Sequence, residues 1–478
     1  MKPTLDNIHS NQQRNKIFSE EYEIIIIGAG IVGCAMARKF TLEGAKVLMI
    51  EKGADIVDGA SKGNSAILHT GFDAPPNSIE HACMVDSYRE YLQIREKLKL
   101  PILKTGALVT AWTEKEESLL QGILTKAHLN GVDDAELITA RAVLNKEPNL
   151  SSTLKAAIQI PREYVIDPWT TPFVYMLQAL QNGASLLRST EVLGGDFDGT
   201  QWAVKTNHGT VKATTVINCA GLYGDKMDEM LIKQTAFEIR PRKGQFLIYD
   251  KAASQLVDSI ILPVPNEITK GVVVCRTIFG NVLVGPTAEE QQSRDDSSVV
   301  KETLEALRKK GEEIIPGLSE VPITATFAGI RPATEFKEYC IQSYNDKQYI
   351  SVGGIRSTGL TSALGIAQLV FKKYQDFGYS HDAPSAIIYP SVTPIAETET
   401  RDWQIDGNEG IVCHCELVTQ REIKQALSGD MAAASLSGLK RRTRVTMGRC
   451  QGFYCSAKLA ELTQGCFDTP MAEGDEHE

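Results

Sequence analysis

Residues 22–53 constrain the fold of this 478-residue chain more than any other stretch. They read YEIIIIGAGIVGCAMARKFTLEGAKVLMIEKG. The run of four isoleucines predicts a buried strand, and the glycine turn after it opens a segment with small residues that suits a helix lying on a sheet. The run AKVLMIE predicts a second buried strand. Strand, turn, helix and strand in this order predict an α/β fold built on a parallel sheet.

The glycine turn between the first strand and the helix has the spacing GxGxxG. In such a turn Gly28 would make the bend, Gly30 would let the backbone approach a pyrophosphate, and Gly33 would allow close packing of helix on strand. The helix N-terminus then faces the phosphates. Glu51 ends the second strand, where a carboxylate accepts hydrogen bonds from a ribose. The unit predicts an adenine-dinucleotide site, and it leaves NAD and FAD open.

Three later segments indicate which kind of dinucleotide enzyme this is. Residues 59–72, GASKGNSAILHTGF, form a polar glycine-rich loop that a simple NAD dehydrogenase does not need. Residues 190–221 alternate apolar and polar side chains, as a β-meander does. Residues 353–370 open another helix with a glycine turn. Because this turn lies so far from the first, we expect a second domain to be inserted between them.

Together with PRKGQF (241–246), NVLVGPTAE (281–289) and FAGIRPAT (327–334), these motifs resemble the FAD-dependent oxidoreductases related to D-amino-acid oxidase and glycine oxidase. The resemblance covers residues 22–380. Within that superfamily, NSAILHTG (64–71) is similar to a loop of the glycerol-3-phosphate and L-2-hydroxyglutarate dehydrogenases. The resemblance implies a Rossmann-like FAD-binding domain made of discontinuous segments, with an inserted α+β domain whose antiparallel sheet covers the flavin.

The resemblance also implies which residues bind FAD along its length. They are Gly28, Gly30, Gly33, Glu51, Lys52, Ser61, Asn64, Ser65, Val192, Ala220, Gly221, Gly354, Gly359, Leu360 and Thr361. For the serines and the asparagine in the loop at 59–72, ordinary turn chemistry is the alternative explanation.

Three side chains are candidates for the chemistry itself. Oxidation of a secondary alcohol needs a group that accepts the hydroxyl proton, and His69 is the candidate. Its alternative is a structural histidine in the flavin loop. Arg331 and Arg356 are candidates for holding an anionic substrate, because a guanidinium binds carboxylate or phosphate well. The alternative for each is an ion pair with a neighbouring carboxylate.

The end of the chain carries two cysteine pairs, Cys413 with Cys415 and Cys450 with Cys455. Four thiolates suit a structural zinc ion or a [2Fe–2S] cluster, and C-x-C is unusual for zinc. The stretch RRTRVTMGRCQGFYC (441–455) resembles the bacterioferritin-associated-ferredoxin-like [2Fe–2S] domain, which follows the same flavin fold in anaerobic-type glycerol-3-phosphate dehydrogenases. The resemblance implies that these four cysteines ligate a [2Fe–2S] cluster, with zinc as the alternative.

The surroundings of the cysteine pairs support a small helical domain. Thr419 and Glu422 form a capping-box pattern that starts a helix just after the first pair, and CSAKLAEL (455–462) predicts a helix at the second. The basic run KRRTR (440–444) would add positive field near the thiolates, or would be a solvated turn. Cys466 falls outside the ligand pattern.

We expect the chain to divide into an N-terminal extension, two interleaved domains, a linker and a tail. The expected ranges are a flexible extension at 1–21, the FAD-binding domain at 22–95, 151–235 and 326–381, the substrate domain at 96–150 and 236–325, a linker at 382–410, and the [2Fe–2S] domain at 411–470.

Charge and hydropathy exclude several other classes of protein. The net charge of −10 disfavours nucleic acid as a partner. The polar first residues carry no signal-peptide pattern, and no apolar run is long enough to span a membrane. We expect a cytoplasmic protein with reduced cysteines, and peripheral contact with the membrane stays open.

The resemblance makes an FAD-dependent dehydrogenase the leading hypothesis, with an electron-acceptor protein, a partner subunit or a quinone pathway receiving single electrons from the cluster. Glycerol 3-phosphate is the first substrate hypothesis and L-2-hydroxyglutarate or another 2-hydroxy acid the second. The further alternatives are an amino- or imino-acid dehydrogenase and a non-catalytic electron-transfer subunit. One departure weakens the first hypothesis, because Asp73 stands where related enzymes often carry a phosphate-holding arginine.

Overall fold

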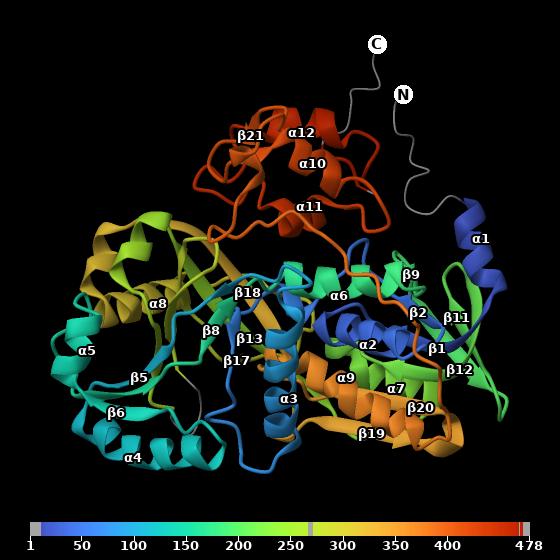
Figure 1. The fold of residues 1–478 in the computed structure, drawn as a ribbon, viewed down its shortest axis with the longest axis horizontal. Helices are drawn as coiled ribbons and strands as arrows, with labels where there is room; N and C mark the ends of the chain where they lie inside the picture. Colours follow the sequence, from blue (N-terminus) through green and yellow to red (C-terminus); the bar gives the residue numbers. More distant parts are fainter. Residues whose placement is uncertain (1–10, 266–270, 468, 472–478) are drawn as a thin grey trace.

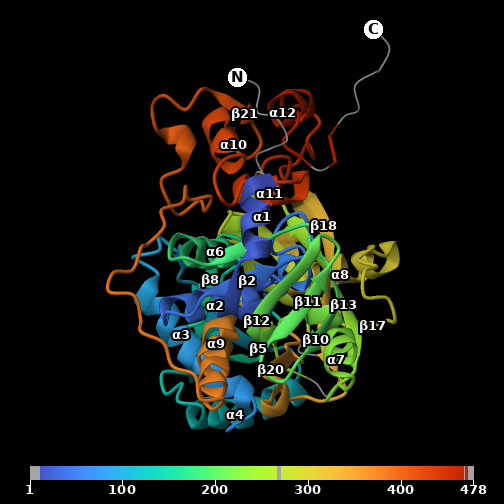
Figure 2. The same cartoon turned by 90° about the vertical axis from the view of Figure 1, so that its right-hand side faces the viewer.

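The computed structural model describes residues 11–265, 271–467 and 469–471. Figure 1 shows two lobes side by side, each built around a sheet, with a small domain (residues 411–467, the tail domain) lying against both. The view turned by 90° in Figure 2 places the tail domain on the same side of the two lobes.

The first lobe is built on an eight-stranded mixed sheet with the order β10-β11-β12-β1-β2-β9, extended by β20 and β19 beside β12. Its strands are β1 (Glu21–Ile27), β2 (Val47–Ile50), β9 (Ser185–Leu187), β10 (Val192–Phe197), β11 (Trp202–Thr206), β12 (Gly209–Asn218), β19 (Cys340–Tyr344) and β20 (Tyr349–Gly353). Strand β1 pairs in parallel with β2 and β12, and β10, β11 and β12 form the expected antiparallel meander. The prediction of an α/β fold around a parallel sheet is confirmed.

Helices cover both faces of this sheet, which explains the run of isoleucines in β1. Ile24 and Ile26 pack in one core with residues of the helices α2, α6, α3 and α9. Ile25 and Ile27 pack on the opposite face, with residues of α7 and α1. The helices are α1 (Asn11–Ser19), α2 (Ile31–Leu42), α3 (Ile79–Ile94), α6 (Thr170–Gln181), α7 (Gly224–Ile232) and α9 (Gly359–Gln375). A parallel strand with both faces buried is apolar throughout.

The second lobe carries a nine-stranded sheet with the order β17-β13-β16-β15-β14-β5-β7-β6, in which β18 also pairs with β13. Its strands are β5 (Ala107–Ala111), β6 (Glu136–Thr139), β7 (Ala156–Ile160), β13 (Ile239–Tyr249), β14 (Ile260–Pro263), β15 (Val273–Arg276), β16 (Val282–Gly285), β17 (Glu289–Glu290) and β18 (Ile323–Thr334). Helices α4 (Glu114–Leu129), α5 (Ala140–Lys146) and α8 (Lys301–Ile314) pack on it.

The expected ranges of the two lobes differ from the structure at two places. Strand β7 pairs with β5 and β6, and β18 pairs with β13 along its whole length, so residues 156–160 and 326–334 belong to the second sheet and not to the first. A three-stranded sheet of β3 (Ile67–Leu68), β8 (Tyr164–Ile166) and β4 (Ile102–Leu103) joins the lobes. Strand pairing is a long-range property, and local sequence does not show which sheet a strand joins.

The expected N-terminal extension and the expected linker also differ from the structure. Residues 11–19 form helix α1, whose Ile17 is buried against the first sheet, whereas residues 1–10 of the expected flexible extension lie outside the described residues. In the expected linker, Arg401 and Asp402 are buried, and their side chains pair with Glu422 and Arg421 of the tail domain. The last part of the linker is therefore part of the tail domain.

The tail domain consists of β21 (Ile411–Cys413), β22 (Val418–Thr419), α10 (Gln420–Ala426), α11 (Leu436–Thr443) and α12 (Ser456–Thr463) around a small apolar core. The capping box of Thr419 and Glu422 is present at the start of α10. Both expected helices are confirmed. Short 3₁₀ helices lie at Ala60–Lys62, Gly221–Tyr223, Lys251–Leu256, Pro316–Glu320, Asn345–Lys347 and Asp402–Gln404. Across the described ranges, no helix combines the length and the apolar character needed to span a membrane.

Candidate functional site

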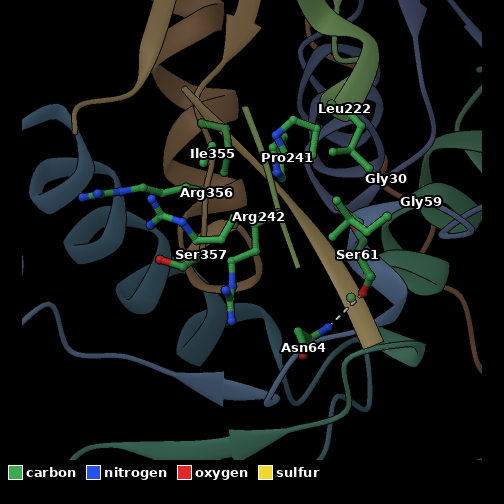
Figure 3. A pocket seen from close by; sticks show the side chains of 18 of the residues that line it. Gly30, Gly59, Ser61, Asn64, Leu222, Pro241, Arg242, Ile355, Arg356 and Ser357 are labelled. Atoms are coloured by element: carbon green, nitrogen blue, oxygen red, sulfur yellow. Dashed lines mark hydrogen bonds between the residues drawn. The ribbon is translucent and has the colours of Figure 1, made fainter. Parts of the chain in front are cut away.

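A cavity of about 1620 Å³ opens between the two lobes. Its wall includes the glycine turn after β1, the loop at 59–72, strands β13 and β18, and the start of α9. Figure 3 shows Gly30, Gly59 and Ser61 on one side of this cavity and Arg242, Arg356 and Ser357 on the other. The sequence motifs from distant parts of the chain therefore meet around one space.

The glycine turn leaves no room for side chains at two of its three glycines. A Cβ on Gly28, whose φ is +99°, would lie 2.6 Å from the carbonyl oxygen of Cys219. A Cβ on Gly33 would lie 1.9 Å from the carbonyl oxygen of Gly28, so helix and strand pack as closely as expected. Gly30 faces the cavity, where the nearest atom to its Cβ would be Ser61 Oγ at 3.1 Å. This surface is open backbone of the kind that a pyrophosphate approaches.

The carboxylate of Glu51 accepts hydrogen bonds from the backbone at this turn. Its Oε2 accepts from the backbone N–H of Ala29 and its Oε1 from that of Gly53, both at 2.7 Å. Burial raises the pKa of Glu51, and these two hydrogen bonds oppose the shift. The neighbouring Lys52 places its Nζ 3.8 Å from the centre of the Tyr223 ring at the cavity wall.

The polar loop at 59–72 closes on itself and on the glycine turn. Ser61 Oγ accepts from the N–H of Ile31 at 3.0 Å. Asn64 donates from Nδ2 to the carbonyl of Ser61 at 2.8 Å, as Figure 3 shows, and accepts from the N–H of Ala66 at 2.7 Å. The side chains thus carry out turn chemistry and still line the cavity, so the two interpretations of this loop coexist.

Most of the expected FAD-binding residues line the cavity. They are Gly28, Gly30, Glu51, Lys52, Ser61, Asn64, Ser65, Val192, Ala220, Gly221, Gly359 and Leu360. Gly33, Gly354 and Thr361 are not among the residues that line it. Thr361 Oγ1 accepts from the N–H of His69 at 3.0 Å and donates to the carbonyl of Ile67 at 3.1 Å, so it fixes the loop to α9.

His69 lines the cavity and is held by a buried acid that sequence reasoning missed. Its Nδ1 lies 2.7 Å from Oε2 of Glu163, whose side chain is 0% exposed. The other oxygen of Glu163 accepts from both the N–H and the Oγ1 of Thr70, at 2.5 and 2.7 Å. Since a carboxylate only accepts, Nδ1 donates to it and Nε2 is left as the basic nitrogen. Glu163 stands far from His69 in the sequence, and no motif marks it.

The two predicted arginines differ in their partners. Arg356 lies 3.6 Å from the buried carboxylate of Glu80, so its ion-pair alternative is realised. Arg331 is half-buried and donates from Nη2 to the carbonyl of Thr287 at 3.1 Å, and no carboxylate among the described residues lies within ion-pair distance of it. Desolvation, with a smaller effect from Arg242, lowers the pKa of Arg331 to about 10. A half-buried cation without an acidic partner at a cavity is suited to an anionic ligand.

Arg242 is a second cation at this wall that the sequence analysis did not single out. It stands directly opposite Arg331 in the antiparallel pair of β13 and β18. Like charges in this position repel each other, and only Arg242 has an acidic partner, Glu290. The wall therefore carries two guanidinium groups side by side, of which Arg242 is neutralised by Glu290.

The four tail cysteines form two contacting pairs. The thiol of Cys415 lies against Cys450, and that of Cys413 lies against Cys455. Across the described ranges, no three His, Cys, Asp or Glu side chains surround a single point that would hold one metal ion. The backbone N–H groups of residues 454, 452 and 453 lower the pKa of Cys450, whereas burial raises the pKa of Cys455 to about 11. Two thiol pairs with backbone donors fit a [2Fe–2S] cluster.

The basic run beside the cysteines is not a solvated turn. Arg442 forms an ion pair of 2.9 Å with the buried Asp55, and Arg441 one of 3.1 Å with Asp58, both in the loop after β2. Burial lowers the pKa of Arg442 to about 10. These arginines dock the tail domain on the first lobe, which sequence spacing did not reveal.

Comparison with known proteins agrees with both sites. Residues 23–372 match the family described as FAD dependent oxidoreductase, and residues 411–464 match the BFD-like [2Fe-2S] binding domain. The glycerol 3-phosphate dehydrogenase of Caloramator mitchellensis is 31% identical over 95% of this chain and 96% of its own. One subunit of the anaerobic glycerol-3-phosphate dehydrogenase of Escherichia coli K12 is 26% identical over 96% of this chain and 91% of its own.

Two further relatives cover the two lobes. The L-2-hydroxyglutarate dehydrogenase of Indibacter alkaliphilus is 26% identical over 73% of this chain and 98% of its own. Among solved structures, the dithionite-reduced L-alpha-glycerophosphate oxidase of Mycoplasma pneumoniae with FAD bound superimposes with a TM-score of 0.72 at 25% identity. That match covers 78% of this chain and 99% of the oxidase.

Proposed function

Because the chain belongs to the family of FAD-dependent oxidoreductases and carries a BFD-like [2Fe-2S] binding domain, we propose that it oxidises glycerol 3-phosphate to dihydroxyacetone phosphate and passes the electrons through the cluster to an external acceptor. One observation carries the choice of substrate. The glycerol 3-phosphate dehydrogenase of Caloramator mitchellensis matches both lobes and the tail over almost the full length of each chain.

FAD bound in the cavity supplies the acceptor for the hydride that leaves the C–H beside the hydroxyl group. His69 takes the hydroxyl proton on Nε2, because its Nδ1–H is already engaged by Glu163. Glu163 keeps the ring in this tautomer and stabilises the imidazolium that forms. Glu163 acts through His69 and is therefore a positioning residue.

Arg331 holds the anionic end of the substrate in this proposal. It lines the cavity and has no carboxylate partner among the described residues, whereas Arg356 is engaged by Glu80. Asp73, the acid that weakened the hypothesis of a phosphate substrate, also lines the cavity. Lys126 Nζ donates to the backbone carbonyl of Asp73 at 2.6 Å. The ammonium group beside Asp73 offsets the repulsion that its carboxylate would exert on a phosphate.

The acceptor is a one-electron partner, because a [2Fe–2S] cluster releases electrons singly. The E. coli relative is one subunit of its enzyme, and we likewise expect the partner of this chain to be a protein or a second subunit. We place the reaction in the cytoplasm, with contact at the membrane surface where the electrons pass on.

The substrate is tested by anaerobic reduction of the flavin, followed at its absorbance band. We expect glycerol 3-phosphate to bleach the flavin at millimolar concentration. Bleaching by L-2-hydroxyglutarate alone would reverse the order of the two substrates. Bleaching by proline or sarcosine alone would make the protein an amine or imino-acid dehydrogenase, and no bleaching by any of them would leave an electron-transfer subunit.

The role of Arg331 is tested by comparing Arg331→Met with Arg356→Met as a control. A hydrogen-bonded charge pair contributes about 1.5–3 kcal/mol, so we expect KM of the first variant to rise about 10- to 100-fold. The control should change KM less, because Arg356 is paired with Glu80. Equal effects of the two substitutions would contradict the assignment.

A further inference from the structure

A stack of three side chains connects the cavity loop with the tail domain. The indole Nε1 of Trp169 donates to the carbonyl of Lys62 at 3.2 Å. The Trp169 ring stacks on Phe279 with 5.2 Å between ring centroids and 13° between planes. The guanidinium carbon of Arg444 lies 4.2 Å from the centroid of the Phe279 ring. The stack therefore reaches from the first lobe, through the second, into the tail.

Each end of the stack adjoins one of the two cofactor sites. Lys62 belongs to the cavity wall, next to Ser61, in the loop expected at the flavin end of FAD. At the other end, Arg444 Nε donates to Oε2 of Glu416 at 2.9 Å, and Glu416 follows Cys415 directly in the chain. At each end, the residue that the stack contacts is the sequence neighbour of a residue expected to bind a cofactor: Lys62 follows Ser61, and Glu416 follows Cys415.

Two members of the stack are buried, and Trp169 is partly buried. Phe279 is 4% exposed and Arg444 is 5% exposed. Arg444 also donates from Nη2 to Oδ1 of Asn281 at 3.3 Å, so it contacts two residues of the second lobe, Phe279 and Asn281. A buried guanidinium over an aromatic face forms a strong cation–π contact.

The other contacts of the tail with the lobes include ion pairs of Arg441 with Asp58 and of Arg449 with Asp250. Arg442 binds Asp55, in the loop that follows Glu51 at the end of β2. That loop belongs to the half of the cavity expected for the adenosine part of FAD, which takes no part in redox chemistry. Among the aromatic contacts of the described residues, the stack is the one that leads from the tail to the loop at 59–72.

We propose that Trp169, Phe279 and Arg444 form the contact across which electrons pass from the flavin to the [2Fe–2S] cluster. The inference rests on the proposed function for the source of electrons. Each crossing oxidises the reduced flavin by one electron and reduces one ferric iron to ferrous iron. The cluster passes that electron to an external one-electron acceptor before the second crossing, and the protons of the reduced flavin go to water.

The test follows both cofactors of the full-length holoenzyme after rapid anaerobic mixing, the flavin by absorbance and the cluster by freeze-quench EPR. Phe279→Leu keeps apolar packing against Trp169 but removes the ring beneath Arg444. We expect flavin reduction at the wild-type rate and cluster reduction slowed roughly tenfold. Trp169→Leu should also slow cluster reduction. Trp169→Phe keeps a stacked ring and should retain most of the wild-type rate of cluster reduction.

Phe173→Leu is the matched control, because Phe173 lies under Arg442 at 5.0 Å in another cation–π contact of the tail, outside the stack. It should leave cluster reduction unchanged. An unaltered rate in Phe279→Leu, or equal slowing in the control, would overturn the proposal. An arm in which light and EDTA reduce the flavin without substrate keeps this test separate from the choice of substrate.

The Phe279→Leu holoenzyme is also compared with wild type by small-angle X-ray scattering. We expect the same compact profile, because the ion pair of Arg442 with Asp55 still docks the tail. An expanded profile would show that the stack only holds the domains together, and it would refute an electron route through it.

Discussion

Replacing Glu163 by glutamine should slow flavin reduction while leaving the flavin bound. The carboxylate is fully buried and has three donors around it, His69 Nδ1 and the N–H and Oγ1 of Thr70. Glutamine has nearly the same shape but only one acceptor oxygen. If its amide faces His69, the ring must move its proton to Nε2, and the nitrogen that takes the substrate proton is blocked.

The size of the effect follows from the bond that is lost. A hydrogen bond to a charged group contributes about 1.5–3 kcal/mol, and about 1.4 kcal/mol corresponds to a tenfold change in rate. We therefore expect the rate of flavin reduction at saturating glycerol 3-phosphate to fall by about 10- to 100-fold. KM should change little, because Arg331 and not Glu163 holds the anion.

The assay is anaerobic stopped-flow absorbance at the flavin band, with flavin content measured on the same samples. The matched control is Glu147→Gln, which removes a buried carboxylate that accepts from the backbone N–H groups of Asp258 and Ser259, away from the cavity. It should lower stability without a specific effect on the rate. A normal rate in Glu163→Gln would refute the role given to the His69–Glu163 pair.

Two further predictions concern the cofactors. Gly30→Val should abolish FAD retention, because the added side chain starts 3.1 Å from Ser61 Oγ and extends into the space of the pyrophosphate; undiminished flavin content in the purified variant would contradict this. Cys450→Ser should remove the cluster, measured as a loss of the about two irons and two sulfides per chain of the wild type, and should leave FAD bound, because Cys450 lies outside the contacts of Arg442 with Asp55. Stoichiometric zinc without acid-labile sulfide in the wild type would instead identify a zinc site.

The sequence alone was enough for the features that depend on local spacing. The glycine turn, its strand and its helix are encoded in consecutive residues, because a tight turn and a close helix–strand contact need glycine at set intervals. The capping box of Thr419 and Glu422 is local in the same way. The resemblance to known families then supplied the two cofactors.

Strand pairing and buried polar partners came only from the structure. Strand β7 is a short, mostly apolar run, and nothing within residues 156–160 says which sheet it joins. The same holds for Glu163, which becomes the partner of His69 only because β8 pairs with β3 and brings the two chain segments together. Contacts between residues far apart in sequence depend on the whole packed chain, and no short motif encodes them.

The basic run at 440–444 shows the division most clearly. By itself the sequence determined that cations stand beside the cluster cysteines, and it left a solvated turn and a field effect as equal alternatives. The tertiary structure decided that Arg441 and Arg442 pair with acids of the first lobe, and that Arg444 lies over Phe279. The physical reason is that a buried guanidinium must find acids, carbonyls or an aromatic face, and only the docked domains bring those partners within reach.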